Sequence, residues 1–206
     1  MNEGNVINCT FTGNNVTGSS SDGGGAIYMD KGNVINCTFT GNTANGSSTI
    51  VGGAIYCLYY TNVTNCNFTG NYARYMGGAF YTMRGGNVSN CIFIGNNANY
   101  WGGAIRLETV DNTKGTVTNC AFVNNSAQNG KVISSSRVLE SIDNNWWGSN
   151  DKPAYVTVDN WVVMNASYTQ NANDIVVFAD FGFCLGHVAR RRYLRKERRK
   201  RQRDGP

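Results

Sequence analysis

Hydrophobic and polar positions alternate along this chain in a block that occurs five times. The first copy reads Asn5-Val6-Ile7-Asn8-Cys9-Thr10-Phe11-Thr12-Gly13-Asn14, and further copies lie at 33–42, 62–71, 87–96 and 116–125. Valine, cysteine and phenylalanine hold fixed places in the copies, whereas the positions beside them vary. Cysteine and phenylalanine are two positions apart, which is the period of a β-strand. We therefore expect the three fixed columns to face inward.

A second block, Gly-Gly-Ala followed by Ile or Phe, recurs at 24–27, 52–55, 77–80 and 102–105. Together the two blocks form a repeat of 25 to 29 residues, which suits one coil of a solenoid. Helical repeats are excluded because no helical periodicity is present, and leucine-rich repeats because leucine is scarce. The sequence predicts an all-β, right-handed, single-stranded parallel β-helix of about five to six coils. Equivalent residues would then stack about 4.8 Å apart.

The constant asparagine between valine and cysteine breaks the alternation and is interpreted as a corner, because asparagine tolerates unusual backbone angles. Stacked asparagines are expected to bond side chain to side chain along the axis. A second asparagine column is expected to do the same at another corner; it contains Asn14, Asn42, Asn71, Asn96 and Asn125. The other predicted ladders are Asn8, Asn36, Asn65, Asn90 and Asn119; Cys9, Cys37, Cys66, Cys91 and Cys120; and Phe11, Phe39, Phe68, Phe93 and Phe122.

The stacked cysteines allow three interpretations. We favour inward free thiols that pack as small apolar residues. One disulfide between neighbouring coils remains an alternative, because the ladder spacing lies within the Cα range of a disulfide. A metal site is disfavoured because no Cys-x-x-Cys is present and His187 is the only histidine. No metal, cofactor or catalytic residue is predicted.

Charge divides the chain into a body and a tail. Ten of the 18 lysines and arginines lie in 190–203, and without residues 190–206 the body has 8 basic and 11 acidic residues. The body therefore offers no basic patch for nucleic acid. We predict β-helix repeats with a Trp-rich C-terminal cap in 1–148 and exit strands or a linker in 149–174. An apolar, then Arg/Lys-rich tail follows in 175–206. The tail is expected to be disordered or loosely helical, and either contacts anionic surfaces or is a non-native sequence.

No signal peptide and no 18-residue apolar span are found. Because the chain starts within a repeat, we expect it to be a fragment of a longer protein.

Aromatic residues supply the candidate ligand contacts. An outward column contains Tyr28, Tyr56, Tyr81 and Arg106, and Tyr75, Tyr100 and Trp101 lie in the loops before Gly-Gly. Exposed aromatic rows suit sugar rings. The alternative is that tyrosine simply favours strand surfaces and cross-coil pairing.

Acidic residues do not form a catalytic pair in this sequence. The stacked column that contains Asp30 and Glu108 places these two acids three coils apart, too far to act on one bond. Serine or cysteine catalysis would need a histidine, which the body lacks. A polysaccharide lyase or hydrolase remains the least favoured hypothesis; it would use Glu108 or Arg106.

The paired motifs Phe11-Thr12-Gly13-Asn14 and Gly24-Gly25-Ala26-Ile27 resemble the repeats of polymorphic outer-membrane proteins. The exact residues of the repeat, Asn-Cys-Thr-Phe-Thr-Gly-Asn and then Gly-Gly-Ala-Ile-Tyr, are similar to those of adhesin-like surface proteins of methanogenic archaea. The segment Asn144-Asn145-Trp146-Trp147-Gly148 shares this similarity. The likeness covers residues 1 to about 165. It implies a β-helix at the cell surface or outside the cell, expected as a monomer, that contacts glycans or surface proteins of other cells. A passive structural stalk is the alternative.

Overall fold

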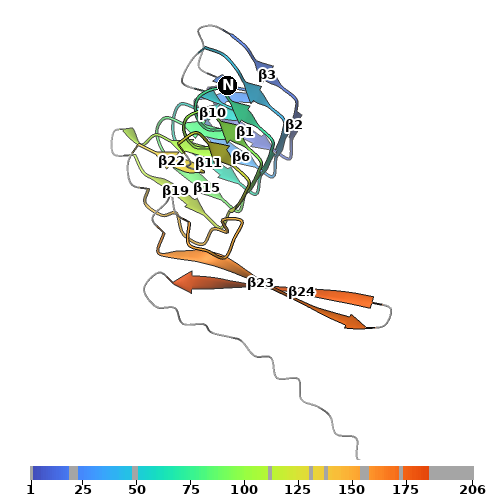
Figure 1. Ribbon diagram of the computed structural model, residues 1–206. Helices are drawn as coiled ribbons and strands as arrows, with labels where there is room; N and C mark the ends of the chain where they lie inside the picture. The colour runs from blue at the N-terminus through green and yellow to red at the C-terminus, as the bar shows by residue number, and fades with distance from the viewer. Residues whose placement is uncertain are drawn as a thin grey trace, which may run out of the picture.

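The computed structural model describes residues 2–18, 23–47, 51–110, 113–129, 132–136, 139–153, 158–171 and 174–185, the side chains of 165–185 excepted. Short strands stack in parallel ladders that wind around one core (Figure 1). This arrangement confirms the predicted parallel β-helix. No helix in the described part of the chain has the length and hydropathy of a membrane span.

Four parallel ladders form the walls of the solenoid. The first contains β1 (Glu3–Ile7), β6 (Lys31–Ile35), β11 (Thr61–Thr64), β15 (Gly86–Ser89) and β19 (Gly115–Thr118). The second contains β2 (Thr10–Thr12), β7 (Thr38–Thr40), β12 (Asn67–Thr69), β16 (Ile92–Ile94) and β20 (Ala121–Val123). The third contains β3 (Asn15–Val16), β8 (Thr43–Ala44), β13 (Tyr72–Ala73), β17 (Asn97–Ala98) and β21 (Ser126–Ala127). The fourth contains β5 (Ile27–Met29), β10 (Ile55–Cys57), β14 (Phe80–Thr82), β18 (Ile105–Leu107) and β22 (Ile133–Ser135). A short pair, β4 (Gly23–Gly24) and β9 (Val51–Gly52), precedes the fourth wall.

Each wall has five strands, and the solenoid makes about four turns. This is slightly fewer than the five to six coils expected from the sequence. Two late segments explain the difference. A diverged copy of the Gly-Gly-Ala-Ile block, Gly130-Lys131-Val132-Ile133 in the sequence, contributes only β22 to the walls. The segment from Ser141 to Trp146 pairs through isolated bridges, to Thr116 and Ala121, and adds no strand to the ladders.

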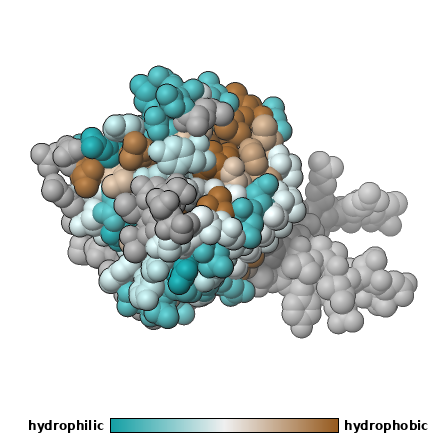
Figure 2. All heavy atoms as spheres, turned by 90° about the horizontal axis from the view of Figure 1, so that it is seen from above, coloured by the Kyte–Doolittle hydropathy of each residue, from teal (hydrophilic) through white to brown (hydrophobic). Residues whose placement is uncertain are grey.

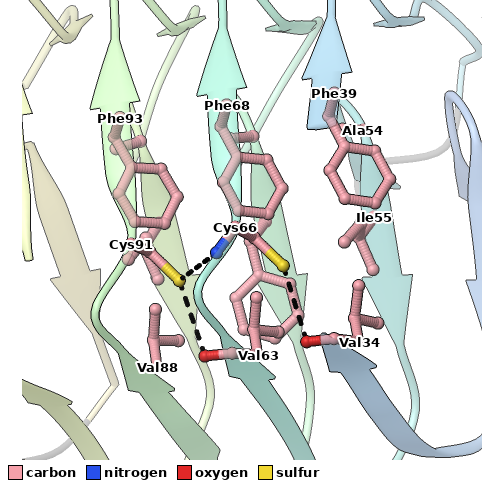
Figure 3. Close-up of a cluster of buried hydrophobic side chains, with 14 of the residues drawn as sticks. Val34, Phe39, Ala54, Ile55, Val63, Cys66, Phe68, Val88, Cys91 and Phe93 are labelled. Carbon is pink, nitrogen blue, oxygen red and sulfur yellow. Dashed lines mark hydrogen bonds between the residues drawn. The ribbon is translucent and has the colours of Figure 1, made fainter. Parts of the chain in front are cut away.

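The strand register places equivalent residues of neighbouring coils opposite one another. Val6 pairs with Val34 and Phe11 with Phe39, and the same match continues along the walls. The phenylalanine rings stack with centroids 4.8 to 5.1 Å apart. Figure 3 shows the valine, cysteine and phenylalanine side chains of neighbouring coils in separate files inside the solenoid. Burial of these apolar files is the main stabilising term of the fold.

The second glycine of each Gly-Gly block lets backbones of neighbouring coils approach closely. A Cβ on Gly53 would clash with the carbonyl oxygen of Gly78, and a Cβ on Gly78 with that of Gly103. Any side chain here would therefore push the coils apart, which explains why glycine recurs at this place.

The Trp-rich cap continues the repeat, but with different residues at the repeat positions. Asn144 has φ +59°, as the corner asparagines do, and the Asn145 side chain accepts a hydrogen bond from the Cys120 amide at 2.8 Å. In earlier coils a cysteine sulfur takes that position. Trp147 then stacks on Phe122 with centroids 5.0 Å apart. Asn145 and Trp147 thus occupy the next cysteine and phenylalanine places.

A two-stranded antiparallel hairpin follows the solenoid, formed by β23 (Asn160–Asn171) and β24 (Asp174–Leu185) (Figure 1). It is joined to the cap by a hydrogen bond from the Val162 amide to the Asn145 carbonyl at 3.0 Å. The expectation of a disordered or loosely helical tail from residue 175 is wrong for 175–185, where a β-branched and aromatic run favours a strand. Residues 186–206 lie outside the described residues.

The first coil is the least buried part of the repeat. β1 is an edge strand, Cys9 is exposed and Phe11 is half-buried, whereas Cys37 and Phe39 in the next coil are buried. In the view from above, the largest group of hydrophobic residues lies at the upper right, and smaller groups are separated from it by polar residues (Figure 2). The same residue types therefore differ in exposure according to whether a coil covers them.

Candidate binding site

From Cys37 onward, the cysteine ladder lies inside the solenoid as free thiols, whereas Cys9 is exposed. Each of these buried ladder thiols accepts a weak hydrogen bond from the preceding coil; the Cys66 amide, for example, donates to the Cys91 sulfur at 3.4 Å (Figure 3). Burial raises the pKa of Cys57 to about 12. The neighbouring Cys91 thiol, together with burial, raises the pKa of Cys66 well above its usual range. These thiols stay protonated at neutral pH, which suits packing rather than nucleophilic attack.

No group of His, Cys, Asp or Glu that could hold a metal ion occurs among the described residues. The same part of the chain contains no disulfide: Cys9, Cys37, Cys57, Cys66, Cys91 and Cys120 are all free.

The two asparagine columns have different roles. The expectation that Asn8, Asn36, Asn65, Asn90 and Asn119 bond side chain to side chain is wrong. These residues are exposed, their φ angles lie between +53° and +56°, and no hydrogen bond joins their side chains in the described ranges. They form the corner through the left-handed backbone conformation that asparagine tolerates.

The second column is the true amide ladder. The Asn71 side-chain oxygen accepts from the backbone amide and from Nδ2 of Asn42, both at 2.9 Å. Asn71 Nδ2 in turn donates to the Phe39 carbonyl at 3.0 Å and to Asn96 Oδ1 at 2.9 Å. These buried amides are fully paired, so they stabilise the coil and leave no polar group for a ligand.

The predicted outward tyrosine column is only partly exposed. Tyr28 is exposed at the first coil, but Tyr56 and Tyr81 are buried, so the expectation that these two contact a ligand is wrong. The tyrosines cover one another, with Tyr28–Tyr56 and Tyr56–Tyr81 centroids 5.3 and 5.4 Å apart. Their role is cross-coil packing.

Arg106, the last member of this column, is held in place by its neighbours. Its Nε donates to Glu108 Oε1 at 2.8 Å, Nη2 contacts the same oxygen, and Nη1 donates to Ser134 Oγ at 2.6 Å. Both side chains of the ion pair are mostly buried. The guanidinium donors are therefore used inside the protein, which argues against Arg106 as a ligand contact.

The loop aromatics do come together. Tyr75 and Tyr100 stack with centroids 5.7 Å apart and planes 10° apart, and Met76 forms a parallel bridge with Trp101. The four side chains line a shallow hollow of about 260 Å³. Tyr100 is 45% exposed and Trp101 37%, so both are accessible to a partner. This hollow, defined by Tyr75, Met76, Tyr100 and Trp101, is the aromatic hollow and the candidate binding site.

Arg74 stands beside the aromatic hollow and was not among the candidates from sequence. Its side chain is exposed, and its guanidinium carbon lies 5.5 Å from the Tyr75 ring centroid. The signal that could have found it is its place directly before Tyr75, in the loop that carries the aromatics. Tyr28 lies on the fourth wall rather than among the residues that line the hollow.

The Chlamydia polymorphic membrane protein repeat matches three segments of this chain, 8–30, 36–58 and 90–108. Each segment begins at or beside a corner asparagine and ends just after a strand of the fourth wall. The chain carries repeats of this type. The matched segments cover 65 of the 206 residues, and they include Tyr100 and Trp101 but not Tyr75. Comparisons with curated proteins and with solved structures gave no significant match.

Proposed function

We propose that this chain is part of a cell-surface, adhesin-like protein that is not catalytic and presents a repetitive wall for recognition of glycans or surface proteins. The observation that carries the proposal is the aromatic hollow, where the exposed rings of Tyr100 and Trp101 line one surface depression together with Tyr75 and Met76. The matched repeat type belongs by name to membrane proteins of Chlamydia, which supports a surface location. The Asn-Trp-Trp-Gly cap supports the finer likeness to adhesin-like proteins of methanogenic archaea.

The scaffold suits this role because the hollow rests on rigid backbone. The Tyr100 amide donates to the Tyr75 carbonyl at 2.9 Å, and the Gly77 amide donates to the Trp101 carbonyl at 3.0 Å. Hydrogen bonds between neighbouring coils thus fix the loops that carry the aromatic side chains. A pre-formed apolar surface loses little conformational entropy when a partner binds.

Two features support a non-catalytic role. Glu108 is neutralised by Arg106 in a mostly buried ion pair. Asp30 and Glu108 directly follow the first and fourth strands of their wall, β5 and β18, and are too far apart to act on one bond.

The second candidate function is a passive structural stalk. It is favoured by the fact that the conserved columns of the repeat are used in packing or hydrogen bonding between coils. On this hypothesis the aromatic hollow only adds stacking between neighbouring loops, and its exposed rings contact no partner.

The proposal is tested with a glycan array and a cell-attachment assay on the full chain. Trp101→Ser and Tyr100→Ser remove the exposed rings, while Ile94→Ser removes an exposed apolar side chain from β16 and is the matched control. Adhesion through the hollow predicts that the first two variants lose attachment and the control keeps it. Equal attachment of all three variants supports the stalk and contradicts the proposed site.

A further inference from the structure

Three cationic side chains in the described part of the body form ion pairs with acids. In the described ranges, ion pairs join Lys31 to Glu3 at 3.2 Å and Lys114 to Glu140 at 2.8 Å, and a third joins Arg106 to Glu108. Arg74 takes part in none of these pairs, although it is exposed. Within the described residues, the Arg74 guanidinium lies over the Tyr75 ring. Within the described residues, the aromatic hollow therefore has at its side a positive charge that is paired with no acid.

Stacking on Tyr75 also orients the guanidinium of Arg74. A planar guanidinium on a ring loses few rotamers when it binds, and its N–H groups around the rim stay free to donate. Such a fork matches the two oxygens of a carboxylate. Tyr75 itself is stacked on Tyr100, so the cation and the Tyr100 ring belong to one stack.

We infer that the aromatic hollow takes an acidic sugar, a pyranose ring that carries a carboxylate. The apolar C–H face of the sugar packs on the Tyr100 and Trp101 rings, and its carboxylate accepts hydrogen bonds from Arg74. This inference rests on the proposed function and names the ligand class of the same site. The charge selects acidic over neutral sugars, whereas the rings alone would bind both.

The size of the hollow limits the ligand to about one sugar ring. Its volume of about 260 Å³ is slightly below the range of small-molecule sites, about 300 to 1,000 Å³. One ring in an open hollow binds weakly, so the acid must supply a substantial share of the affinity. Added salt should therefore weaken binding, because an exposed charge pair is screened.

The test measures binding of the full chain to four probes by titration. They are a galacturonic acid trimer, its methyl ester, which lacks the charge, a galactose trimer, and an N-acetylneuraminic acid glycoside. The uronate and the sialoside distinguish the two sources of a carboxylated pyranose. Arg74→Gln removes the cation, and Arg74→Lys keeps the charge without the planar fork. Arg84→Gln is the matched control, because Arg84 lies over another tyrosine, Tyr59, at 5.1 Å.

We expect wild type to bind at least one acidic probe about tenfold more tightly than the neutral probes. Arg74→Gln should lose that advantage and keep the neutral affinity, Arg74→Lys should keep part of it, and Arg84→Gln should match wild type. Equal binding of acid and ester by wild type overturns the inference and leaves the proposed function standing. If attachment to cells depends on Trp101 but the chain binds none of the four sugars, the inference of an acidic sugar is also overturned. Failure of both the sugar titrations and Trp101-dependent attachment overturns the proposed function as well.

Discussion

Trp147 stacks on Phe122 with ring centroids 5.0 Å apart and planes 18° apart, nearly the geometry of the phenylalanine pairs below it. Trp147 therefore covers the last ring of the phenylalanine file rather than merely lying near the end of the solenoid. An indole is larger than a phenyl ring, so it shields more of the apolar end from water. The cap works because it continues the repeat with a bulkier side chain.

Replacing this tryptophan should weaken the end of the solenoid. We expect Trp147→Ala to lower the free energy of unfolding by about 2 to 4 kcal/mol, because the half-buried ring leaves Phe122 uncovered. Trp147→Phe retains the stack and should cost under about 1.5 kcal/mol. Urea unfolding measures both variants. Equal losses for Ala and Phe would show that the stack is not the stabilising contact.

The inner amide ladder should be more sensitive than the surface asparagines. Asn71→Ala removes the acceptor for the Asn42 amide and the donor to the Phe39 carbonyl. Leaving these buried groups unpaired should cost about 2 to 4 kcal/mol. Asn67→Ala, on the exposed face of β12, should change stability by less than about 0.5 kcal/mol. Similar unfolding midpoints for the two variants would refute the ladder's structural role.

The corner asparagines should respond to backbone rather than side-chain changes. Asn65 has φ +55°, which glycine adopts freely and β-branched residues adopt poorly. We expect Asn65→Gly to stay within about 0.5 kcal/mol of wild type and Asn65→Val to cost about 1 to 2 kcal/mol. Thermal and urea unfolding provide the comparison. A large loss for the glycine variant would restore the original idea of a side-chain ladder at this corner.

Alkaline pH should destabilise the fold through its buried thiols. The pKa of Cys57 is raised from 9.0 to about 12, so the folded state holds this proton more tightly than the unfolded state. Its contribution is fully present below pH 9 and is lost as the pH rises toward 12, with a slope of up to about 1.4 kcal/mol per pH unit. Urea unfolding under reducing conditions between pH 8 and 11 measures the slope. Cys57→Ala should reduce it, and an unchanged slope would contradict this assignment.

The sequence predicted the walls well because neighbouring coils contain the same residues at the same places. Phe11 and Phe39 hold the same place in their copies of the repeat, so a single strand register stacks identical residues on one another. Side-chain exposure was harder to predict. Tyr28 and Tyr56 are equivalent in sequence, yet Tyr28 is exposed and Tyr56 is buried, since Tyr56 lies between the rings of Tyr28 and Tyr81 and Tyr28 is at the end of the column. Equivalent places in the repeat therefore do not fix how much of a side chain is covered.

The cap was predicted by resemblance, but its repeat character was missed. Cys120 and Asn145 are 25 residues apart, a spacing that already occurs between Cys66 and Cys91. Asparagine in place of cysteine and tryptophan in place of phenylalanine hid the match. Arg74 was missed for another reason: a single charged residue in a loop shows no periodicity, and its importance arises only from its contact with Tyr75.

The most direct test of the account is a footprinting measurement on the full chain, with and without the ligand that binds best in the arrays. Radical or carbene labelling reports solvent protection residue by residue. The account predicts protection of Arg74 and of the four residues of the aromatic hollow, with no change at Tyr59 or Ile94. Protection confined to another wall, or a bound ligand that leaves Trp101 as accessible as before, would contradict it.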